Sequence, residues 1–158
     1  MPAQRKLLYF ASPLFSDAEK QSNRILASAL ERWCDVFLPQ RDGELIPDLI
    51  HKGLSPEDAY KVVFDRDIKA INACDGLIIN MDGRAVDEGA AFELGYAYAL
   101  GKVCVGYSTD ARALLPWGQN PMITTPLKQV FSCPELLEKW AKQFAVAKVD
   151  ARLRLVAN

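Results

Sequence analysis

The fold is decided by residues 76–107, which read GLIINMDGRAVDEGAAFELGYAYALGKVCVGY. This stretch begins with an unbroken apolar run at 76–81 and ends with another at 102–107. Between them, residues 87–100 favour a helix that is closed by Gly101. Apolar runs without polar alternation indicate strands that are buried on both faces. The stretch therefore predicts two parallel strands joined by a crossover helix.

The same alternation of strand and helix extends on both sides of this unit. Residues 40–54 are polar and interrupted by proline and glycine, so we expect a long loop there, with room for a helical turn. The whole pattern predicts an α/β, flavodoxin-like, doubly wound fold with a mostly parallel five-stranded sheet and helices on both faces. Ligands of such folds bind at the carboxyl ends of the strands. The remaining strands are expected at 6–11, 36–38 and 129–131, and the remaining helices at about 16–33, 55–73 and 134–147.

Length and charge limit the classes of function. The 158 residues fit one domain, 1–158, with half of its residues apolar, a balance typical of a soluble globular protein. The net charge is -1, from 19 basic and 20 acidic residues, which argues against binding a nucleic acid polymer. No apolar run approaches the length of a membrane span, and the short run after Arg5 and Lys6 meets Ser12 and Pro13 too early for a signal peptide.

Cysteine and histidine are placed unfavourably for metal binding. The four cysteines are about 30 to 40 residues apart with no CxxC pair, and His51 is the only histidine. We therefore expect no metal and no cofactor, and we interpret the cysteines as reduced thiols of a cytoplasmic protein. A single histidine also argues against a Ser-His-Asp catalytic triad or a Cys-His dyad, so carboxylates are the best candidates for catalysis.

Asp67 carries its charge on an apolar helix face. In the helix expected at 55–73, it shares a stripe at helical spacing with apolar side chains. A carboxylate on such a face is costly unless it is paired or solvated. Two interpretations stay open: a buried hydrogen-bonding partner of a neighbouring loop, or an acid in a cleft. The other members of the stripe are Tyr60, Val63, Phe64, Ile68 and Ile71.

The helix expected at 87–100 carries two more carboxylates of interest. Glu93 lies on a strip of small residues that begins at Gly89, where another molecule can approach closely. Gly89 and Gly95 each cost a helix roughly 1 kcal/mol relative to alanine, which suggests a need for close approach. Tight helix packing is the alternative. Asp87, at the turn from strand to helix, is either a plain N-cap or a functional acid.

The loop after the first strand lies at the binding edge of the predicted sheet. It contains Ser12 and Phe15, and Tyr9 in the preceding strand has a phenol that needs a partner if it is buried. The chain has no glycine-rich phosphate loop, and this loop has no lysine or arginine. A ligand that places a phosphate here is therefore disfavoured.

Four segments together resemble the nucleoside 2-deoxyribosyltransferase family. The most specific part is a combination of two motifs. The CDG that ends the segment at 67–76 leads into a strand, and the core segment VDEGAAFELGYAYALGK at 86–102 follows that strand. The resemblance covers residues 7 to about 125 and implies a flavodoxin-like fold. The other segments are LLYFASPLFS at 7–16, DIKAINACDG at 67–76 and QNPMI at 119–123.

The resemblance also implies a reaction. Family members move a 2-deoxyribosyl group between purine or pyrimidine bases, so the expected ligands are small deoxynucleosides and free nucleobases. Glu93 would be the nucleophile that forms a covalent glycosyl-enzyme, with retention of configuration through double displacement. Asp67 and Asp87 match the acids on the base side, and Tyr9 matches the residue that positions the nucleophile. An anion beside the anomeric carbon suits the oxocarbenium-like transition state.

Substrate contacts are implied for five further residues. The resemblance implies that Phe15 packs against the base, and we expect Ser12 and Gly89 at the substrate. Asn120 matches an asparagine that reaches the sugar hydroxyls from a neighbouring subunit, with Met122 beside it. The family is therefore expected to form homo-oligomers, built from dimers and often hexameric, with sites shared between subunits.

Two other functions compete with the transferase. One is a 2'-deoxynucleoside or deoxynucleoside 5'-monophosphate N-glycosidase of the same superfamily, whose members carry serine and arginine in the first loop, where this chain has PLFSD. The other is a nucleoside-binding domain without catalysis. Base preference stays open, because Gly43 falls near the position where many relatives carry a glutamine or asparagine that reads the base.

Overall fold

The computed structural model describes residues 5–111 and 119–147. Within them, strands and helices alternate along the chain as expected. The tail at 148–158 lies outside the described residues. The strands are β1 (Leu7–Ala11), β2 (Asp35–Phe37), β3 (Gly76–Asn80), β4 (Val103–Tyr107) and β5 (Val130–Phe131), and the helices are α1 (Asp17–Leu30), α2 (Pro39–Asp42), α3 (Ile46–His51), α4 (Pro56–Ala73), α5 (Glu88–Ala99), α6 (Pro121–Thr124) and α7 (Pro134–Val146).

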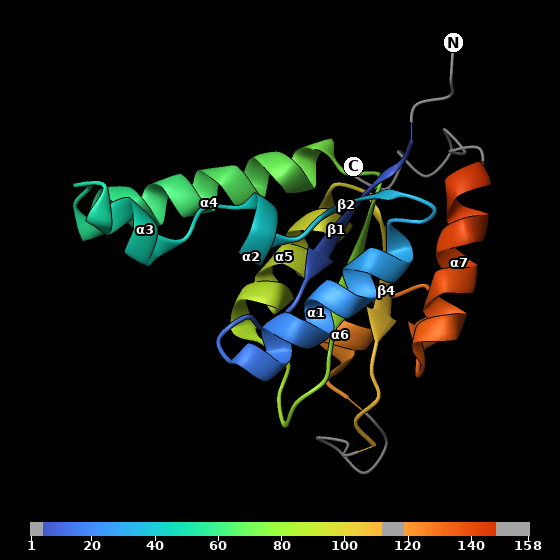
Figure 1. The fold of residues 1–158 in the computed structure, drawn as a ribbon. Helices are drawn as coiled ribbons and strands as arrows, with labels where there is room; N and C mark the ends of the chain where they lie inside the picture. The colour runs from blue at the N-terminus through green and yellow to red at the C-terminus, as the bar shows by residue number, and fades with distance from the viewer. Residues whose placement is uncertain (1–4, 112–118, 148–158) are drawn as a thin grey trace.

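The five strands form one parallel sheet in the order β2-β1-β3-β4-β5 (Figure 1). The register pairs Tyr9 of β1 with Phe37 of β2 on one side and with Leu77 of β3 on the other. All five residues of β3 are buried, as the continuous apolar run predicted. This architecture confirms the α/β, flavodoxin-like fold class, with the chain reversing its strand order at β1 and β3.

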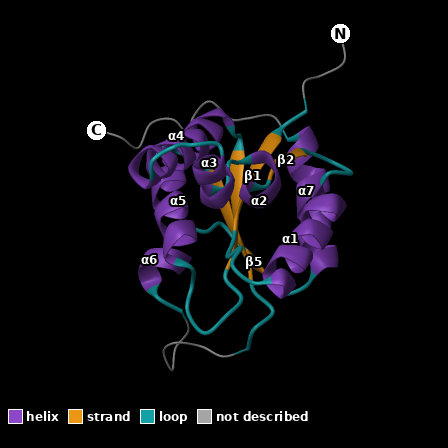
Figure 2. Cartoon of the chain, turned by 60° about the vertical axis from the view of Figure 1, so that its left-hand side comes forward, coloured by secondary structure: helices purple, strands orange, loops and turns teal. Residues whose placement is uncertain are grey.

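Helices cover both faces of the sheet. Figure 2 shows the sheet between α1 and α7 on one side and α4, α5 and α6 on the other. Because side chains alternate along a strand, Phe10 points into a core with α1 and α7, whereas its neighbour Tyr9 joins a core with α4 and α5. These two faces are called the α7 face and the α5 face below.

The predicted helix starts are present. Ser16 accepts a hydrogen bond from the backbone of Glu19, whose side chain bonds back to Ser16, which completes a capping box. Ser55 caps α4 through the Asp58 amide. Gly101 follows α5 with a φ of 69°, the left-handed conformation expected where it closes the helix.

The long loop expected at 40–54 is wrong. Most of this segment belongs to the short helices α2 and α3. Proline lies in the first turn of each, where its missing N–H costs nothing, so Pro39 and Pro47 begin helices instead of interrupting a loop. Gly43 is needed after α2, because a β-carbon there would lie 2.5 Å from the Pro39 carbonyl oxygen.

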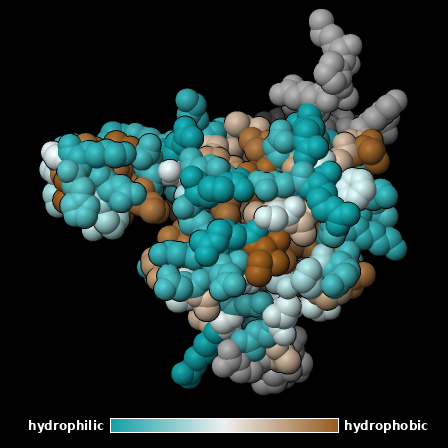
Figure 3. Space-filling view, viewed as in Figure 1, coloured by the Kyte–Doolittle hydropathy of each residue, from teal (hydrophilic) through white to brown (hydrophobic). Residues whose placement is uncertain are grey.

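An arm projects from the body of the molecule. It consists of α3 and the first half of α4, which extend together beyond α5 (Figure 1). Brown apolar atoms show among the teal ones on this arm (Figure 3). Leu49 of α3 is buried, whereas Tyr60 of α4 is 60% exposed. Among the described helices, none is long and apolar enough to cross a membrane.

Candidate active site

Glu93 and Tyr9 form the centre of the site. Tyr9 has no exposed surface, and its Oη donates a hydrogen bond to Glu93 Oε1 at 2.5 Å. Its ring stacks on Phe37 at 5.4 Å between centroids and 16° between planes. Burial and the neighbouring Glu93 raise the pKa of Tyr9 above its ordinary value, so the phenol keeps its proton. Tyr9 is therefore a fixed donor aimed at the Glu93 carboxyl.

The Glu93 carboxyl holds its proton unusually tightly. Burial disfavours the charged form and, together with the charges of Asp67 and Asp87, raises the pKa of Glu93 to about 8. The hydrogen bond from Tyr9 acts in the opposite direction and favours the carboxylate. A strongly perturbed acid beside a specific partner is typical of functional sites.

Asp67 is half-buried on the α4 stripe. In the described part of the chain it accepts no hydrogen bond and forms no ion pair. The buried-partner interpretation of this residue is therefore wrong. Burial raises the pKa of Asp67 to about 6, although the charge of Arg66 acts against this. The result is an unpaired acid that titrates near neutral pH.

Asp87 is the N-cap of α5. Its Oδ2 accepts a hydrogen bond from the Ala90 amide at 2.8 Å. A β-carbon at Gly89 would lie 3.2 Å from the same oxygen, so glycine gives this carboxylate room. The N-cap interpretation is thus correct for Oδ2, while the charge of Asp87 also acts on Glu93. At Gly95 a β-carbon meets nothing within 4 Å in the described chain, so close approach by another molecule there stays a prediction.

A cleft of about 230 Å³ opens beside Glu93 and Asp67, between α4 and α5. Its walls are apolar and aromatic, with Phe64 and Phe92 at 6.0 Å between ring centroids. The exposed part of the α4 stripe lines this cleft, since Phe64 is 53% exposed, whereas Ile71 at its far end is fully buried and also belongs to the core of the α5 face. Among its described lining residues, the acidic and basic side chains are two carboxyl groups, and the lining comprises Ile46, Tyr60, Val63, Phe64, Asp67, Ile68, Ile71, Gly89, Phe92 and Glu93.

Four expected substrate contacts lie outside this lining. Ser12 is buried at the end of β1, and Phe15 is 78% exposed in the following loop. The Asn120 side chain caps the short helix α6 by accepting from the Met122 amide at 2.9 Å. Met122 is 79% exposed. Within one chain, the structure thus brings together Tyr9, Asp67, Asp87, Gly89 and Glu93 and leaves these four apart.

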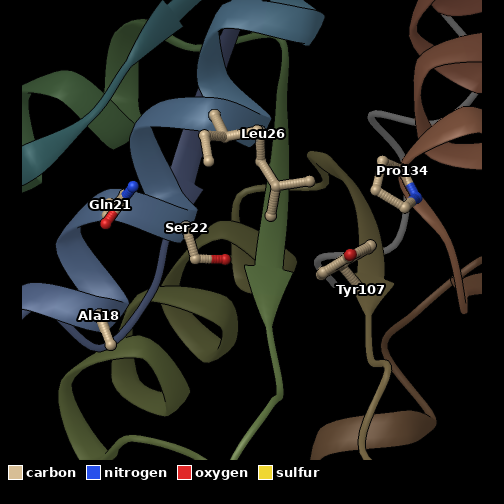
Figure 4. Close-up of a pocket in the computed structure, with 7 residues that line it drawn as sticks. Ala18, Gln21, Ser22, Leu26, Tyr107 and Pro134 are labelled. Atoms are coloured by element: carbon tan, nitrogen blue, oxygen red, sulfur yellow. The ribbon is translucent and has the colours of Figure 1, made fainter.

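A second, larger groove of about 330 Å³ lies on the α7 face (Figure 4). Residues of α1 form one wall, with Tyr107 and Pro134 opposite. No carboxyl group is among its described lining residues. Of these two cavities, only the cleft on the α5 face is therefore lined by acids whose pKa is raised.

Metal or thiol chemistry has little support in the described residues. No group of three or more histidine, cysteine, aspartate or glutamate side chains there is arranged to hold a metal ion. All four cysteines are free. Burial raises the pKa of Cys74 to about 11 and that of Cys104 to about 12, so these thiols stay protonated. The groups that this cleft offers for chemistry are therefore the carboxyls of Glu93 and Asp67.

Sequence reasoning missed several residues around the site. Phe37 and Arg66 are not among the described lining residues of the cleft, but Phe37 stacks on Tyr9 and the Arg66 Cζ lies 5.7 Å from the Phe37 ring centroid. Phe92 forms a wall of the cleft and stacks on Tyr96. Only Phe92 had a signal in the sequence, as a large apolar residue directly before Glu93.

Comparison with known protein families gives one match over most of the chain. The model of the nucleoside 2-deoxyribosyltransferase family matches residues 8–151. None of the curated proteins that were compared matches significantly.

Solved structures show the same fold. A conserved protein of Enterococcus faecalis V583 is 26% identical, with a TM-score of 0.75 over 89% of this chain and 99% of that one. A 2-deoxyribosyltransferase of Bacillus psychrosaccharolyticus is 26% identical, with a TM-score of 0.69 over 84% of this chain and 90% of that one. A CMP N-glycosidase of Clostridium botulinum is similar in fold alone, at 20% identity and a TM-score of 0.51 over 88% of this chain and 99% of that one.

Proposed function

This chain belongs to the nucleoside 2-deoxyribosyltransferase family, and we propose on that basis that it transfers a 2-deoxyribosyl group from one nucleobase to another. The observation that carries the proposal is the half-buried Glu93 carboxyl, which accepts a hydrogen bond from Tyr9 and lies with the unpaired Asp67 beside an apolar cleft. A carboxylate and a proton donor at one cleft are what glycosyl transfer by double displacement requires.

The proposed reaction has two balanced steps. In the first, a Glu93 carboxylate oxygen bonds to the anomeric carbon while the bond from that carbon to the base nitrogen breaks, and Asp67 gives its proton to the departing base. In the second, a nitrogen of the incoming base bonds to the same carbon, the glycosyl ester breaks, and Asp67 recovers a proton from that base. Two inversions at one carbon give net retention. Asp87 acts on Glu93 through its charge.

The two perturbed acids set the expected pH dependence. With pKa values of about 6 for Asp67 and about 8 for Glu93, the pair holds one proton between these limits. The reactive form has this proton on Asp67 and the charge on Glu93, the less populated of the two arrangements. The Tyr9 hydrogen bond favours this form. We therefore expect a bell-shaped dependence of kcat/KM on pH, with apparent pKa values near 6 and 8. These values describe the Asp67–Glu93 pair and not either residue alone.

The cleft favours nucleosides over nucleotides. Its described lining contains two carboxyl groups and no basic side chain, so a phosphate placed there would be repelled. Phe64 and Phe92 offer aromatic surface for a base. This supports deoxynucleosides and free bases as ligands and argues against the nucleotide N-glycosidase alternative.

A second copy of the chain is proposed to complete the site. The cleft is smaller than the roughly 300 Å³ at which ligand pockets usually begin, and the aromatic side chains on its walls are half exposed. Asn120 and Met122 are exposed and lie outside the cleft of their own chain. The proposal therefore assigns them to the site of a neighbouring copy, in a homo-oligomer built from dimers.

The test is an exchange assay. The protein is mixed with a deoxynucleoside and a different free base, across purine and pyrimidine pairs, and the new deoxynucleoside is measured by chromatography. We expect exchange, reduced roughly 10³-fold or more in Glu93→Gln. Unchanged exchange in that variant would exclude Glu93 as the nucleophile. Rapid hydrolysis of deoxynucleotides without any base exchange would replace the transferase with the N-glycosidase.

Hybrid oligomers test the shared site. Glu93→Ala and Asn120→Ala chains are each assayed alone and then after mixing under conditions that exchange subunits. If Asn120 acts in a neighbouring copy, hybrids contain some sites with both residues intact and recover part of the activity. A mixture no more active than its separate components contradicts the proposal.

A further inference from the structure

Phe37 connects Tyr9 to α4. It is the last residue of β2, and its ring stacks on the buried Tyr9 ring at 5.4 Å. The guanidinium of Arg66, on α4, lies over the Phe37 ring at 5.7 Å, within the range of a cation–π contact. Arg66 Nη2 also donates to the Asp42 carbonyl oxygen at 3.0 Å. Phe37 is therefore in contact with a strand on one side and a helix on the other.

The corner between β2 and α2 holds Phe37 in place. Asp42 Oδ2 accepts from the Leu38 amide at 2.9 Å, directly after Phe37. Arg41 Nη2 donates to the Val36 carbonyl oxygen at 2.9 Å, directly before Phe37. Arg41 in turn pairs with Asp42 at 2.7 Å. Hydrogen bonds to one ion pair thus hold the backbone on both sides of Phe37, and this restricts the movement of its ring.

The orientation of the Tyr9 ring depends on its contact with the Phe37 ring. Its hydrogen bond is the one protein hydrogen bond that the Glu93 carboxyl accepts in the described part of the chain. The strength of a hydrogen bond falls steeply with misalignment, and the ring of Tyr9 must be held in one orientation to keep Oη on Glu93. The stacked Phe37 ring restricts that orientation from the β2 side.

We propose that Phe37, held by Arg66, is a positioning residue that keeps the Tyr9 hydroxyl on Glu93 and so favours the charge on Glu93. The activity part of the argument rests on the function proposed above. Arg66 also acts on Asp67 through its charge, so Phe37 is the cleaner residue to test. The groups that face the Tyr9–Glu93 pair are Asp67 of α4, Asp87 at the start of α5 and the Cys74 thiol before β3.

The first experiment is a double-mutant cycle on kcat and KM. Phe37→Leu should lower kcat about 10-fold with little change in KM, the scale of one hydrogen bond to a charged group. Phe37→Tyr keeps a ring and should retain most of the activity. In a Tyr9→Phe background, Phe37→Leu should cost less than about 2-fold, because the hydrogen bond is already absent. Equal losses in both backgrounds would overturn the proposal.

Phe131→Leu is the matched control. Phe131 ends the opposite edge strand and packs on Trp140 at 6.1 Å, far along the sheet from Tyr9. Its loss should lower stability while leaving kcat and the pH profile unchanged. If kcat falls as far in Phe131→Leu as in Phe37→Leu, the loss of an aromatic ring from either edge strand lowers activity. That result would overturn the proposal.

The second experiment is independent of the reaction. The Glu93 side-chain carboxyl is followed by ¹³C NMR during a pH titration and assigned with Glu93→Gln. Phe37→Leu should raise the pKa of Glu93, because the Tyr9 hydrogen bond lowers it. An unchanged titration overturns the positioning role whatever the protein catalyses. A shifted titration without any base exchange would overturn the proposed function alone.

Discussion

The two faces of the sheet use the same strands for different purposes. On the α7 face, Phe10 has no exposed surface and lies in an apolar core with α1 and α7. On the α5 face, its neighbour Tyr9 is equally buried but bonds to a carboxyl whose pKa is raised to about 8. Both faces therefore bury an apolar core, but the α5 face also bears the energetic cost of burying acids whose pKa is raised. The contrast predicts that mutations on the two faces will separate stability from activity.

The largest effect is expected on the α7 face. Leu137 of α7 is 1% exposed and carries no chemistry. Leu137→Ala should lower the free energy of unfolding by about 3 kcal/mol through lost burial and a cavity. Its kcat/KM should stay within about 2-fold of the wild type wherever the protein is folded. Urea unfolding and the exchange assay measure the two quantities, and a large loss of kcat/KM in folded protein would break the division between faces.

On the α5 face, Asp67→Asn should show the opposite pattern. It removes the proposed proton donor, so kcat should fall roughly 10²-fold, while stability is kept or improved because a buried charge is lost. Asp65→Asn is the matched control on the same helix, since Asp65 is exposed and pairs with Lys61 at the surface. The control should retain full activity. Equal activity of the two variants would remove Asp67 from the reaction.

The pH dependence of stability sharpens the comparison. The Glu93 pKa is about 8 in the folded protein against about 4.5 unfolded, so the folded state binds more protons between these values. The contribution of Glu93 to the free energy of unfolding is therefore fully present below about pH 4.5 and is lost as the pH rises to 8. Glu93→Gln should be more stable than wild type at pH 8 to 9, by roughly 2 kcal/mol given its partial exposure, and the gap should close near pH 4.5. Thermal unfolding across this range measures it, and a constant gap would contradict the assigned shift.

The smallest effect concerns the exposed side of α5. A β-carbon at Gly95 meets nothing within 4 Å, so Gly95→Ala should stabilise the chain by roughly 0.5–1 kcal/mol through helix propensity. Gly106→Ala is the contrasting variant, because its β-carbon would lie 2.9 Å from Leu127 Cδ1, 3.1 Å from Met81 Sδ and 3.2 Å from Val130 Cγ2, and we expect this crowding by three side chains to destabilise the chain. Unfolding midpoints compare the two. A destabilised Gly95→Ala would show that another copy packs closely on this helix.

Much of the fold followed from local patterns. Apolar runs located the strands, and capping residues such as Ser16 and Ser55 located the helix starts, because both signals depend on neighbouring residues alone. The segment at 40–54 was misread since a proline that begins a short helix resembles one that interrupts a loop.

The site was predicted less completely. Helical spacing put Asp67 on an apolar stripe, but periodicity cannot distinguish a core from the wall of a cleft, and Phe64 proved half exposed. Phe37 and Arg66 lie 29 positions apart and meet only through the packing of α4 on the end of β2, which no local pattern encodes. Asn120 and Met122 have no contact with the cleft of their own chain, so the structure of one chain leaves their expected role a prediction.

The arm made of α3 and the first half of α4 has a consequence for protein engineering. Glu93 and Tyr9 are anchored in α5 and the central strand β1, whereas Ile46 and Tyr60 contribute to the cleft from the projecting arm. Groups held on regular elements keep their geometry when other parts of a scaffold are altered. We therefore expect that exchanging the arm between relatives changes the substrates of the proposed reaction, while Glu93, the proposed nucleophile, keeps its hydrogen bond from Tyr9.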